Sequence, residues 1–173
     1  GASKIAGDLT ETNAKVISSV EETSKYKFIP EKDLFDVEYW SLEQAKIKKT
    51  KKILQGNVVV ITGGFGAIGS ATYKLFKSYG AEIILLDNDA KKVKEMGDKI
   101  KDLCLHCDVR NKNSVKNAFK KISEEYGGID ILISNAGTAI GGFIAEVDDK
   151  TLRESFEDNF FSHQNCASET IKI

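Results

Sequence analysis

The sequence is poor in proline, methionine and tryptophan, each of which occurs once in 173 residues, and it holds only three cysteines. Three cysteines are too few for a disulfide scaffold, which favours a reducing compartment. No apolar leader opens the chain at Gly1, and no segment approaches the roughly 18 apolar residues of a membrane span. These absences predict a cytoplasmic protein with no membrane partner.

The sequence also lacks an excess of either charge, because 25 basic residues stand against 26 acidic ones and the net charge is -1. A nearly neutral chain gives no electrostatic case for binding nucleic acid. The basic run at residues 46–52 is interpreted as a solvated linker face rather than a phosphate-binding patch. With 41% hydrophobic residues the chain can bury a core, and a small molecule is the expected partner.

Two of the cysteines, Cys104 and Cys107, have C-x-x-C spacing, with His106 between them. A zinc site would need a second pair of ligands at suitable spacing. The string lies in an apolar stretch at 103–109 that is typical of a buried strand, in which successive side chains point to opposite faces. We therefore expect the two cysteines to face apart in the core, His106 to be a hydrogen-bonded core histidine, and no metal to bind.

From residue 57 onward, apolar runs typical of buried strands alternate with amphipathic helical stretches. Strands are expected at 58–61, 83–86, 103–109 and 129–134. Helices are expected at 67–79, between the second strand and about residue 100, at 113–126, and from about 150 to the end. Strands buried on both faces and separated by helices form βαβ units around a parallel sheet. The predicted fold class is α/β, a Rossmann-type doubly wound parallel sheet of about four strands on residues 56–173.

Residues 1–55 break this rhythm. They contain a predicted helix around 9–22 and the single proline, and we expect them to form a helical extension or linker.

Three of the predicted helices carry an apolar stripe that is expected to face the core. In the helix that begins at 113 the stripe consists of Val115, Ala118, Phe119 and Ile122. In the helix at 67–79 the stripe consists of Ile68, Ala71, Thr72, Leu75 and Tyr79. Tyr73 and Lys77, which have Y-x-x-x-K spacing, lie away from this stripe and are assigned to solvent. In the last helix the stripe consists of Leu152, Phe156, Phe160 and Cys166.

A glycine-rich turn lies between the first strand and its helix. Free backbone N–H groups and the positive end of the helix dipole make such a turn a binding site for pyrophosphate. The candidate residues are Thr62, Gly63, Gly64, Phe65, Gly66, Ala67, Ile68 and Gly69. The context of strand, turn and helix makes the string a prediction of a bound dinucleotide.

Asp87 ends the second predicted strand, at the distance from the turn expected of a ribose-binding acid, and Asn88 follows it. A carboxylate there accepts hydrogen bonds from the hydroxyls of the adenosine ribose and repels a 2′-phosphate. Asp87 therefore favours NAD over NADP as the cofactor, and Asn88 is a further candidate cofactor-binding residue. The alternative is that Asp87 is only a loop residue after a strand.

The segment from Thr62 to Gly69 resembles the T-G-x-x-x-G-x-G loop of the short-chain dehydrogenase/reductases, and three further motifs follow in the order of that family. The resemblance implies that Asp108 and Val109 lie against the adenine. It also implies that Asn135, followed by Ala136 and Gly137, braces the central strand. Asn159 resembles the active-site asparagine that holds a water in a proton relay, and the alternative is that Asn159 only caps or bends its helix.

The loop departs from the family at one position. The family register places glycines at Gly63, position 67 and Gly69, but position 67 is Ala67. An extra methyl group there would crowd a pyrophosphate. The plain G-x-G-x-x-G string gives a second register, Gly64, Gly66 and Gly69, and the sequence leaves both open.

Hydride transfer in the family needs a tyrosine as general acid or base and a lysine four residues further on. The family places them after a fifth strand, so we expect them downstream of this sequence. The resemblance implies an NAD-dependent oxidoreductase acting on an alcohol or carbonyl substrate, with this chain as the cofactor-binding portion, inactive alone. The alternative is a non-catalytic dinucleotide-binding module for regulation or assembly. A homo-oligomer is expected to form through the C-terminal helix, which carries Phe156, Phe160 and Phe161.

Residues 33–46 have a resemblance of their own. They look like the segment that joins the two halves of bifunctional aldolase/short-chain dehydrogenases, the group that includes rhamnulose-1-phosphate aldolase/alcohol dehydrogenases. This resemblance implies an aldolase domain before the dehydrogenase portion.

Overall fold

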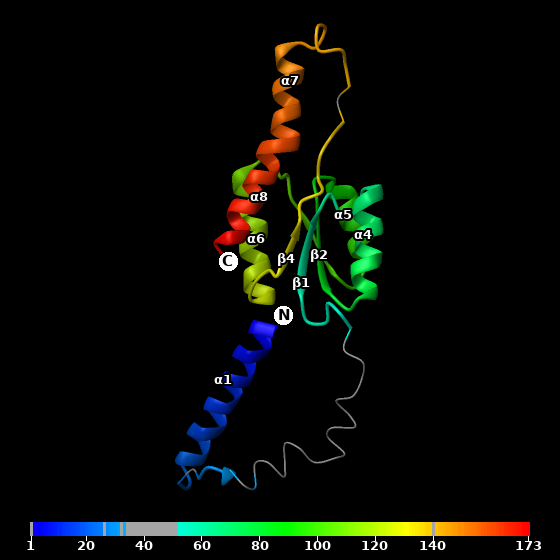
Figure 1. The fold of residues 1–173 in the computed structure, drawn as a ribbon. Helices are drawn as coiled ribbons and strands as arrows, with labels where there is room; N and C mark the ends of the chain where they lie inside the picture. Colours follow the sequence, from blue (N-terminus) through cyan, green and yellow to red (C-terminus); the bar gives the residue numbers. More distant parts are fainter. Residues whose placement is uncertain (1, 26, 32, 34–51, 140) are drawn as a thin grey trace.

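A four-stranded parallel sheet forms the centre of the molecule, as Figure 1 shows. The computed structural model describes residues 2–25, 27–31, 33, 52–139 and 141–173. The strands are β1 (Val58–Thr62), β2 (Glu82–Asp87), β3 (Leu103–His106) and β4 (Ile131–Ile133). Their order is β3-β2-β1-β4, and each neighbouring pair is parallel. The predicted α/β class and doubly wound parallel sheet are confirmed.

The strand order reverses between β1 and β4. The chain proceeds from β1 outward to β2 and β3, then returns to place β4 on the other side of β1. In open parallel sheets the loops diverge at such a reversal and leave a crevice beyond the carboxyl ends of the strands. The topology therefore fixes where a ligand is to be sought.

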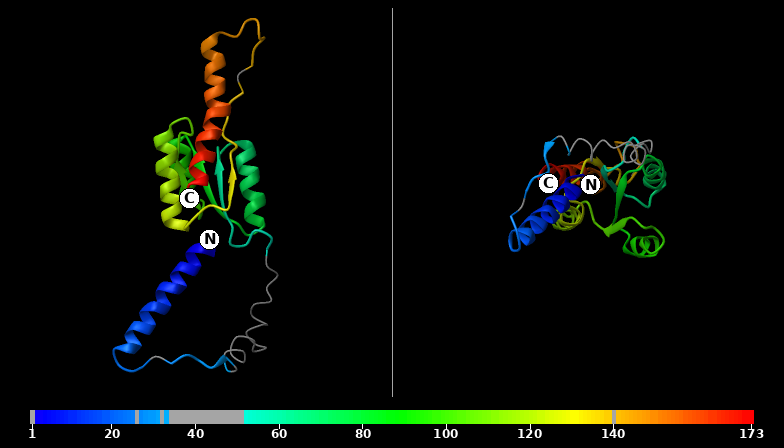
Figure 2. Two further views of the ribbon diagram at one scale, coloured as in Figure 1. Left: turned by 60° about the vertical axis from the view of Figure 1, so that its left-hand side comes forward. Right: turned by 90° about the horizontal axis from the view of Figure 1, so that it is seen from below.

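Helices cover both faces of the sheet (Figure 2). One face carries α4 (Ala67–Ser78) and α5 (Ala90–Gly97). The other carries α6 (Lys112–Tyr126) and α8 (Ser162–Ile171). Between β4 and α8 the chain forms α7 (Asp149–Phe156), which extends beyond the carboxyl edge of the sheet (Figure 1), and the π-helical turn η1 (Glu157–Phe161).

The core consists of two apolar layers, one on each face of the sheet, because successive strand residues point to opposite faces. The first layer consists of Val58, Val60 and residues of α6 and α8. The second layer consists of Val59, Ile61 and neighbouring strand residues, and side chains of α4 pack against it. The side chains of β1 and the middle of β2 are at most 1% exposed. Burial on both faces explains why these strands are continuous apolar runs rather than alternating ones.

Side chains and a glycine cap the ends of several helices. Asn111 accepts hydrogen bonds from the backbone at the start of α6, and Gly127 ends that helix in the left-handed conformation, with φ at 77°. Asp89 caps α5 and Asp148 caps α7 in the same way. A side-chain acceptor at the N-cap replaces a hydrogen bond that the helix itself cannot supply.

The face of α4 that meets the sheet differs from the prediction. Ile68 is 72% exposed and Leu75 is 50% exposed, so the predicted apolar stripe faces outward. Gly69 is buried instead, and Tyr73 and Phe76 pack against the second core layer. Hydrophobic periodicity was misleading here because the close contact of Gly69 with the glycine-rich turn sets the rotation of the helix.

The assignment of Tyr73 and Lys77 to solvent was also wrong. The Tyr73 hydroxyl donates to the Asp102 carboxylate at 2.9 Å, and Lys77 forms an ion pair with the same carboxylate. Burial and the hydrogen bond to Asp102 raise the pKa of Tyr73 to about 12. Asp102 precedes β3, so this cluster lies at the amino edge of the sheet and ties α4 to the start of that strand.

The predicted last helix is present, with helical residues from 149 to 171, but a π-helical turn interrupts its α-helical repeat. The π-helical turn η1 adds a residue to the turn and so rotates α8 relative to α7. Leu152 and Phe156 are therefore exposed, whereas Cys166 is fully buried in the first core layer. The four residues of the predicted stripe do not share one face.

The C-x-x-C string is divided between the two core layers. Cys104 packs in one layer and Cys107 in the other, so the two thiols face apart as predicted. His106 is exposed, although its Nε2 lies 3.1 Å from the carbonyl oxygen of Asn88, so its expected place in the core was wrong. Among the described residues, no group of three or more histidine, cysteine or acidic side chains could hold a metal ion.

The N-terminal helix α1 (Ala2–Glu21) is longer than predicted and extends away from the sheet (Figure 1). Near its start, the Lys4 ammonium donates to the carbonyl oxygen of Glu125, at the end of α6. Residues 34–51, which include most of the segment resembling the bifunctional enzymes and most of the basic run, lie outside the described residues. The boundary at 55/56 stays a prediction.

Candidate functional site

The glycine-rich turn between β1 and α4 is built around two close backbone contacts. Gly63 has φ at +63°, a conformation that side-chain-bearing residues rarely adopt. A Cβ on Gly69 would lie 2.2 Å from the carbonyl oxygen of Gly63, so the first turn of α4 can pack on the loop only without one. Gly66 is the N-cap and offers no side chain to the first-turn N–H groups of α4. The loop and the positive end of the α4 dipole therefore face the crevice, where their backbone N–H groups could hold an anion.

The positive φ distinguishes the two registers of the glycine motif. It falls on Gly63 rather than Gly64, so the tight turn belongs to the T-G-x-x-x-G-x-G register. Gly64 is needed for a different reason, because a Cβ there would lie 2.9 Å from the Leu85 side chain. Ala67 is exposed at the start of α4, where the family register has its second glycine.

Asp87 is held at the carboxyl end of β2 by two backbone hydrogen bonds. One carboxylate oxygen accepts from the Phe65 N–H at 3.1 Å and the other accepts from the Asp89 N–H at 3.1 Å. The Gly64 N–H also donates to the carbonyl oxygen of Leu86. These bonds attach the glycine-rich loop to the end of β2 and fix the carboxylate beside it.

Thr62 joins the ends of β1 and β4. Its hydroxyl oxygen is fully buried and accepts from the N–H groups of Asn135 at 2.9 Å and Ala136 at 3.0 Å. The Asn135 amide in turn donates to the carbonyl oxygens of Thr62 at 3.0 Å and Gly63 at 3.3 Å. The predicted brace of the central strand is thus present as a reciprocal set of bonds across the point where the strand order reverses.

A charged network closes the side of the crevice beyond β3. Arg110 contacts the Asp108 carboxylate at 3.2 Å and the Asp158 carboxylate of η1 at 3.5 Å. Asp158 also accepts from the Thr138 hydroxyl at 2.7 Å. Burial opposes ionisation of Asp108, but the hydrogen bonds from Arg110 outweigh it and lower the pKa of Asp108. Asn165 of α8 donates to the carbonyl oxygen of Val109 at 3.1 Å, which holds the loop after β3 in place.

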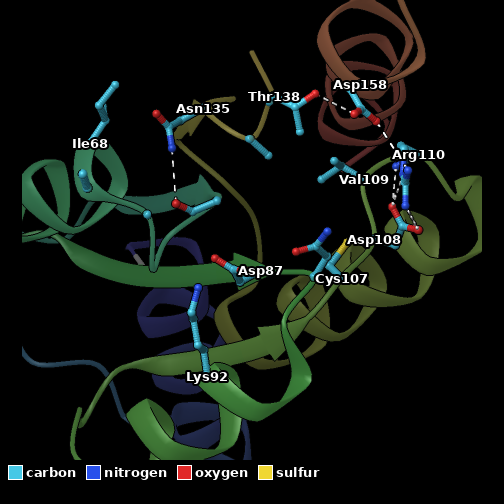
Figure 3. Close-up of a pocket in the computed structure, with 16 residues that line it drawn as sticks. Ile68, Asp87, Lys92, Cys107, Asp108, Val109, Arg110, Asn135, Thr138 and Asp158 are labelled. Carbon is cyan, nitrogen blue, oxygen red and sulfur yellow. Dashed lines mark hydrogen bonds and ion pairs between the residues drawn. The ribbon is translucent and has the colours of Figure 1, made fainter. Parts of the chain in front are cut away.

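These loops surround one cavity of about 460 Å³ at the carboxyl edge of the sheet (Figure 3). The predicted site residues in its wall are Gly63, Gly66, Ala67, Ile68, Asp87, Asn88, Asp108, Val109, Asn135, Ala136 and Gly137. The remaining residues of the loop do not line the cavity but hold the loop in position; they are Thr62, Gly64, Phe65 and Gly69. The structure adds Lys92, Cys107, Arg110, Thr138 and Asp158 to the wall.

Asn159 lies on η1 and does not line the cavity. Its side-chain oxygen accepts from the Thr138 N–H at 3.0 Å, and its amide donates to the carbonyl oxygens of Thr138 at 2.9 Å and Ser155 at 3.0 Å. The amide therefore joins the loop after β4 to the π-helical turn. This is a positioning role for the side chain, and a catalytic role for Asn159 stays a prediction.

Sequence reasoning missed the added residues for identifiable reasons. Lys92 could have been found from the sequence. Asp89 is an N-cap residue, so the helix that it begins places Lys92 in its first turn, close to Asp87. Arg110, Thr138 and Asp158 come together only through contacts between the loops after β3 and β4 and the π-helical turn.

Comparison with known proteins decides the family. Residues 57–173 match the family described as short chain dehydrogenase. The chain belongs to the short-chain dehydrogenase family. This is a family of oxidoreductases that bind nicotinamide dinucleotides. Residues 1–47 match a second family, described as the second domain of class II aldolases, which agrees with the resemblance to bifunctional enzymes.

Individual relatives of this short-chain dehydrogenase support the assignment. It is 37% identical over 131 residues to short chain aldehyde dehydrogenase 1 of Euphorbia lathyris, a match that covers 72% of this chain and 45% of the relative. It is 29% identical over 161 residues to the uncharacterized oxidoreductase YuxG of Bacillus subtilis, covering 88% of this chain and 23% of that protein. The aldohexose dehydrogenase of Thermoplasma acidophilum superposes with a TM-score of 0.62 at 28% identity, over 70% of this chain and 45% of that one. The chain thus spans less than half the length of each of these relatives.

None of the helices in the described part of the chain is long and apolar enough to cross a membrane.

Proposed function

We propose that the cavity at the carboxyl edge of the sheet binds NAD for an oxidoreductase that acts on an alcohol or carbonyl substrate. The observation that carries this proposal is the convergence of the glycine-rich loop, Asp87, Asp108 and Asn135 on one cavity. A pyrophosphate would lie against the loop and the N-terminus of α4. The adenosine ribose would lie against Asp87, and the adenine between that strand end and Val109.

The preference for NAD rests on Asp87. Its carboxylate is fixed by the N–H groups of Phe65 and Asp89, yet it still lines the cavity and keeps lone pairs for a ribose diol. A 2′-phosphate would bring negative charge toward this carboxylate, which raises the free energy of binding NADP. The substrate class, the catalytic role of Asn159 and the position of the family's tyrosine and lysine outside this sequence belong to the same proposal.

The test is isothermal titration of the chain with NAD and with NADP, compared with Asp87→Ala. NAD is expected to bind, and the substitution is expected to raise its dissociation constant about tenfold, since it removes charge-assisted hydrogen bonds. Asp98→Ala, at the exposed end of α5, is the matched control and is expected to change nothing. The proposal fails if neither nucleotide binds, or if NAD binds equally well to the Asp87 variant.

We also propose that copies of the chain associate through η1 and the helices beside it. Phe156, Phe160 and Phe161 are all exposed, and the last two form an edge-to-face pair with ring centroids 5.3 Å apart. Exposed aromatic clusters of this kind mark contact surfaces. Sedimentation equilibrium is expected to show a dimer or larger species, and Phe160→Asp is expected to shift it toward monomer. A monomer at all concentrations would contradict the proposal.

A further inference from the structure

The wall of the cavity holds a cation beside the acid assigned to the ribose. Lys92, the third residue of α5, lines the cavity together with Asp87. Figure 3 shows the Lys92 side chain extending from α5 toward Asp87, with its ammonium end nearest the strand. Its side chain is 58% exposed, so the ammonium group can move to meet a ligand.

A second acid restrains this lysine. The Asp89 carboxylate lies 3.5 Å from the Lys92 ammonium, and it also accepts from the backbone N–H groups of Lys91 and Lys92 at 3.1 Å. The bond from the Lys92 backbone is the main cause that lowers the pKa of Asp89, with the Lys92 ammonium contributing. The corner of the cavity therefore combines two carboxylates, Asp87 and Asp89, with one ammonium.

We propose that Lys92 is a second specificity-determining residue, a latent binding site for the 2′-phosphate of NADP. In the unchanged chain Asp87 repels that phosphate, and Asp89 neutralises the Lys92 ammonium. The inference rests on the proposed function, since it concerns the same ribose corner. A 2′-phosphate carries more than one negative charge and is attracted by a nearby ammonium. The attraction is weaker when a carboxylate already neutralises that ammonium. With Asp87 present, repulsion prevails and NAD is selected. With Asp87 absent, Lys92 supplies the attraction that makes NADP acceptable.

Four variants separate the contributions when the dissociation constants of NAD and NADP are measured by titration. Asp87→Ser is expected to raise the affinity ratio of NADP to NAD about tenfold, the scale of a single charge-assisted hydrogen bond. Adding Lys92→Ala is expected to remove most of that increase. Adding Asp89→Ser instead is expected to increase the ratio further, because serine still caps α5 but no longer neutralises Lys92. Lys91→Ala in the Asp87→Ser background is the matched control.

Lys91 is on the same turn of α5 and carries the same charge, but it does not line the cavity and its ammonium lies 4.0 Å from Glu95. Its removal is expected to leave the ratio unchanged. The inference is overturned if Lys92→Ala leaves the ratio of the Asp87→Ser variant unchanged, or if Lys91→Ala lowers it equally, because the effect would then be one of net charge. If the unchanged chain binds neither nucleotide, the proposed function fails together with this inference, whereas NAD binding without any effect of Lys92 overturns the inference alone.

Discussion

Replacing Gly69 with alanine is expected to lower the free energy of unfolding of the sheet domain by about 3 kcal/mol and to remove nucleotide binding. The added Cβ would lie 2.2 Å from the Gly63 carbonyl oxygen and 2.9 Å from the Gly64 Cα. Both contacts are with backbone, so no side chain can rotate away to relieve them. Either α4 moves off the sheet or the turn at Gly63 opens, and each change disrupts the anion-binding end of the helix. Urea unfolding followed by circular dichroism measures the stability.

Gly141→Ala is the control for this substitution. A Cβ on Gly141 meets nothing within 4 Å, and the residue has no positive φ, so its stability should change by less than about 0.5 kcal/mol. If Gly69→Ala were as stable as Gly141→Ala, the close packing of α4 on the loop would be refuted, and with it the explanation for the outward apolar stripe of that helix.

Thr62→Val is expected to lower the free energy of unfolding by about 2 to 4 kcal/mol, because it leaves two backbone donors without an acceptor in a buried place. Valine keeps the shape of threonine, so the substitution removes the hydroxyl acceptor of the Asn135 and Ala136 N–H groups and little else. The loop after β4 should then shift, and the affinity for NAD should fall about tenfold or more because that loop forms one wall of the cavity.

Thr62→Ser separates the hydroxyl from the methyl group. Serine keeps the acceptor and loses one buried methyl, so the expected cost is about 1 kcal/mol, with NAD affinity close to that of the unchanged chain. Thermal unfolding and titration of the three proteins give both quantities. Equal stability of the valine and serine variants would show that the hydroxyl is not the link between β1 and β4.

The sheet could be predicted from the sequence because its central strands are buried on both faces. A run such as 58–61 has few other places in a folded chain, and the helical stretches between the apolar runs have the length that a parallel sheet requires. The positions of Asp87 and Asn135 beside the same loop follow from strand order alone, because parallel strands end at one edge of the sheet.

Features that the pattern of apolar residues does not record could not be predicted. The rotation of α4 is set by a backbone contact at Gly69, which the spacing of apolar residues does not reveal. Ile68 and Leu75 were therefore assigned to the wrong face. The π-helical turn has no compositional mark, so the register shift between Phe156 and Cys166 was missed. The carboxylate of Asp102 is local to neither Tyr73 nor Lys77, although it determines where both side chains lie.

The location of the nucleotide is the central claim, and amide chemical shifts measured by NMR during a titration with NAD test it most directly. The account predicts saturable shifts confined to four backbone segments, at 63–69, 87–92, 108–110 and 135–138, while the amino edge around Asp102 stays unchanged. Shifts centred on the amino edge, or no saturable shift at any residue, would contradict the placement of the cofactor at the carboxyl edge of the sheet.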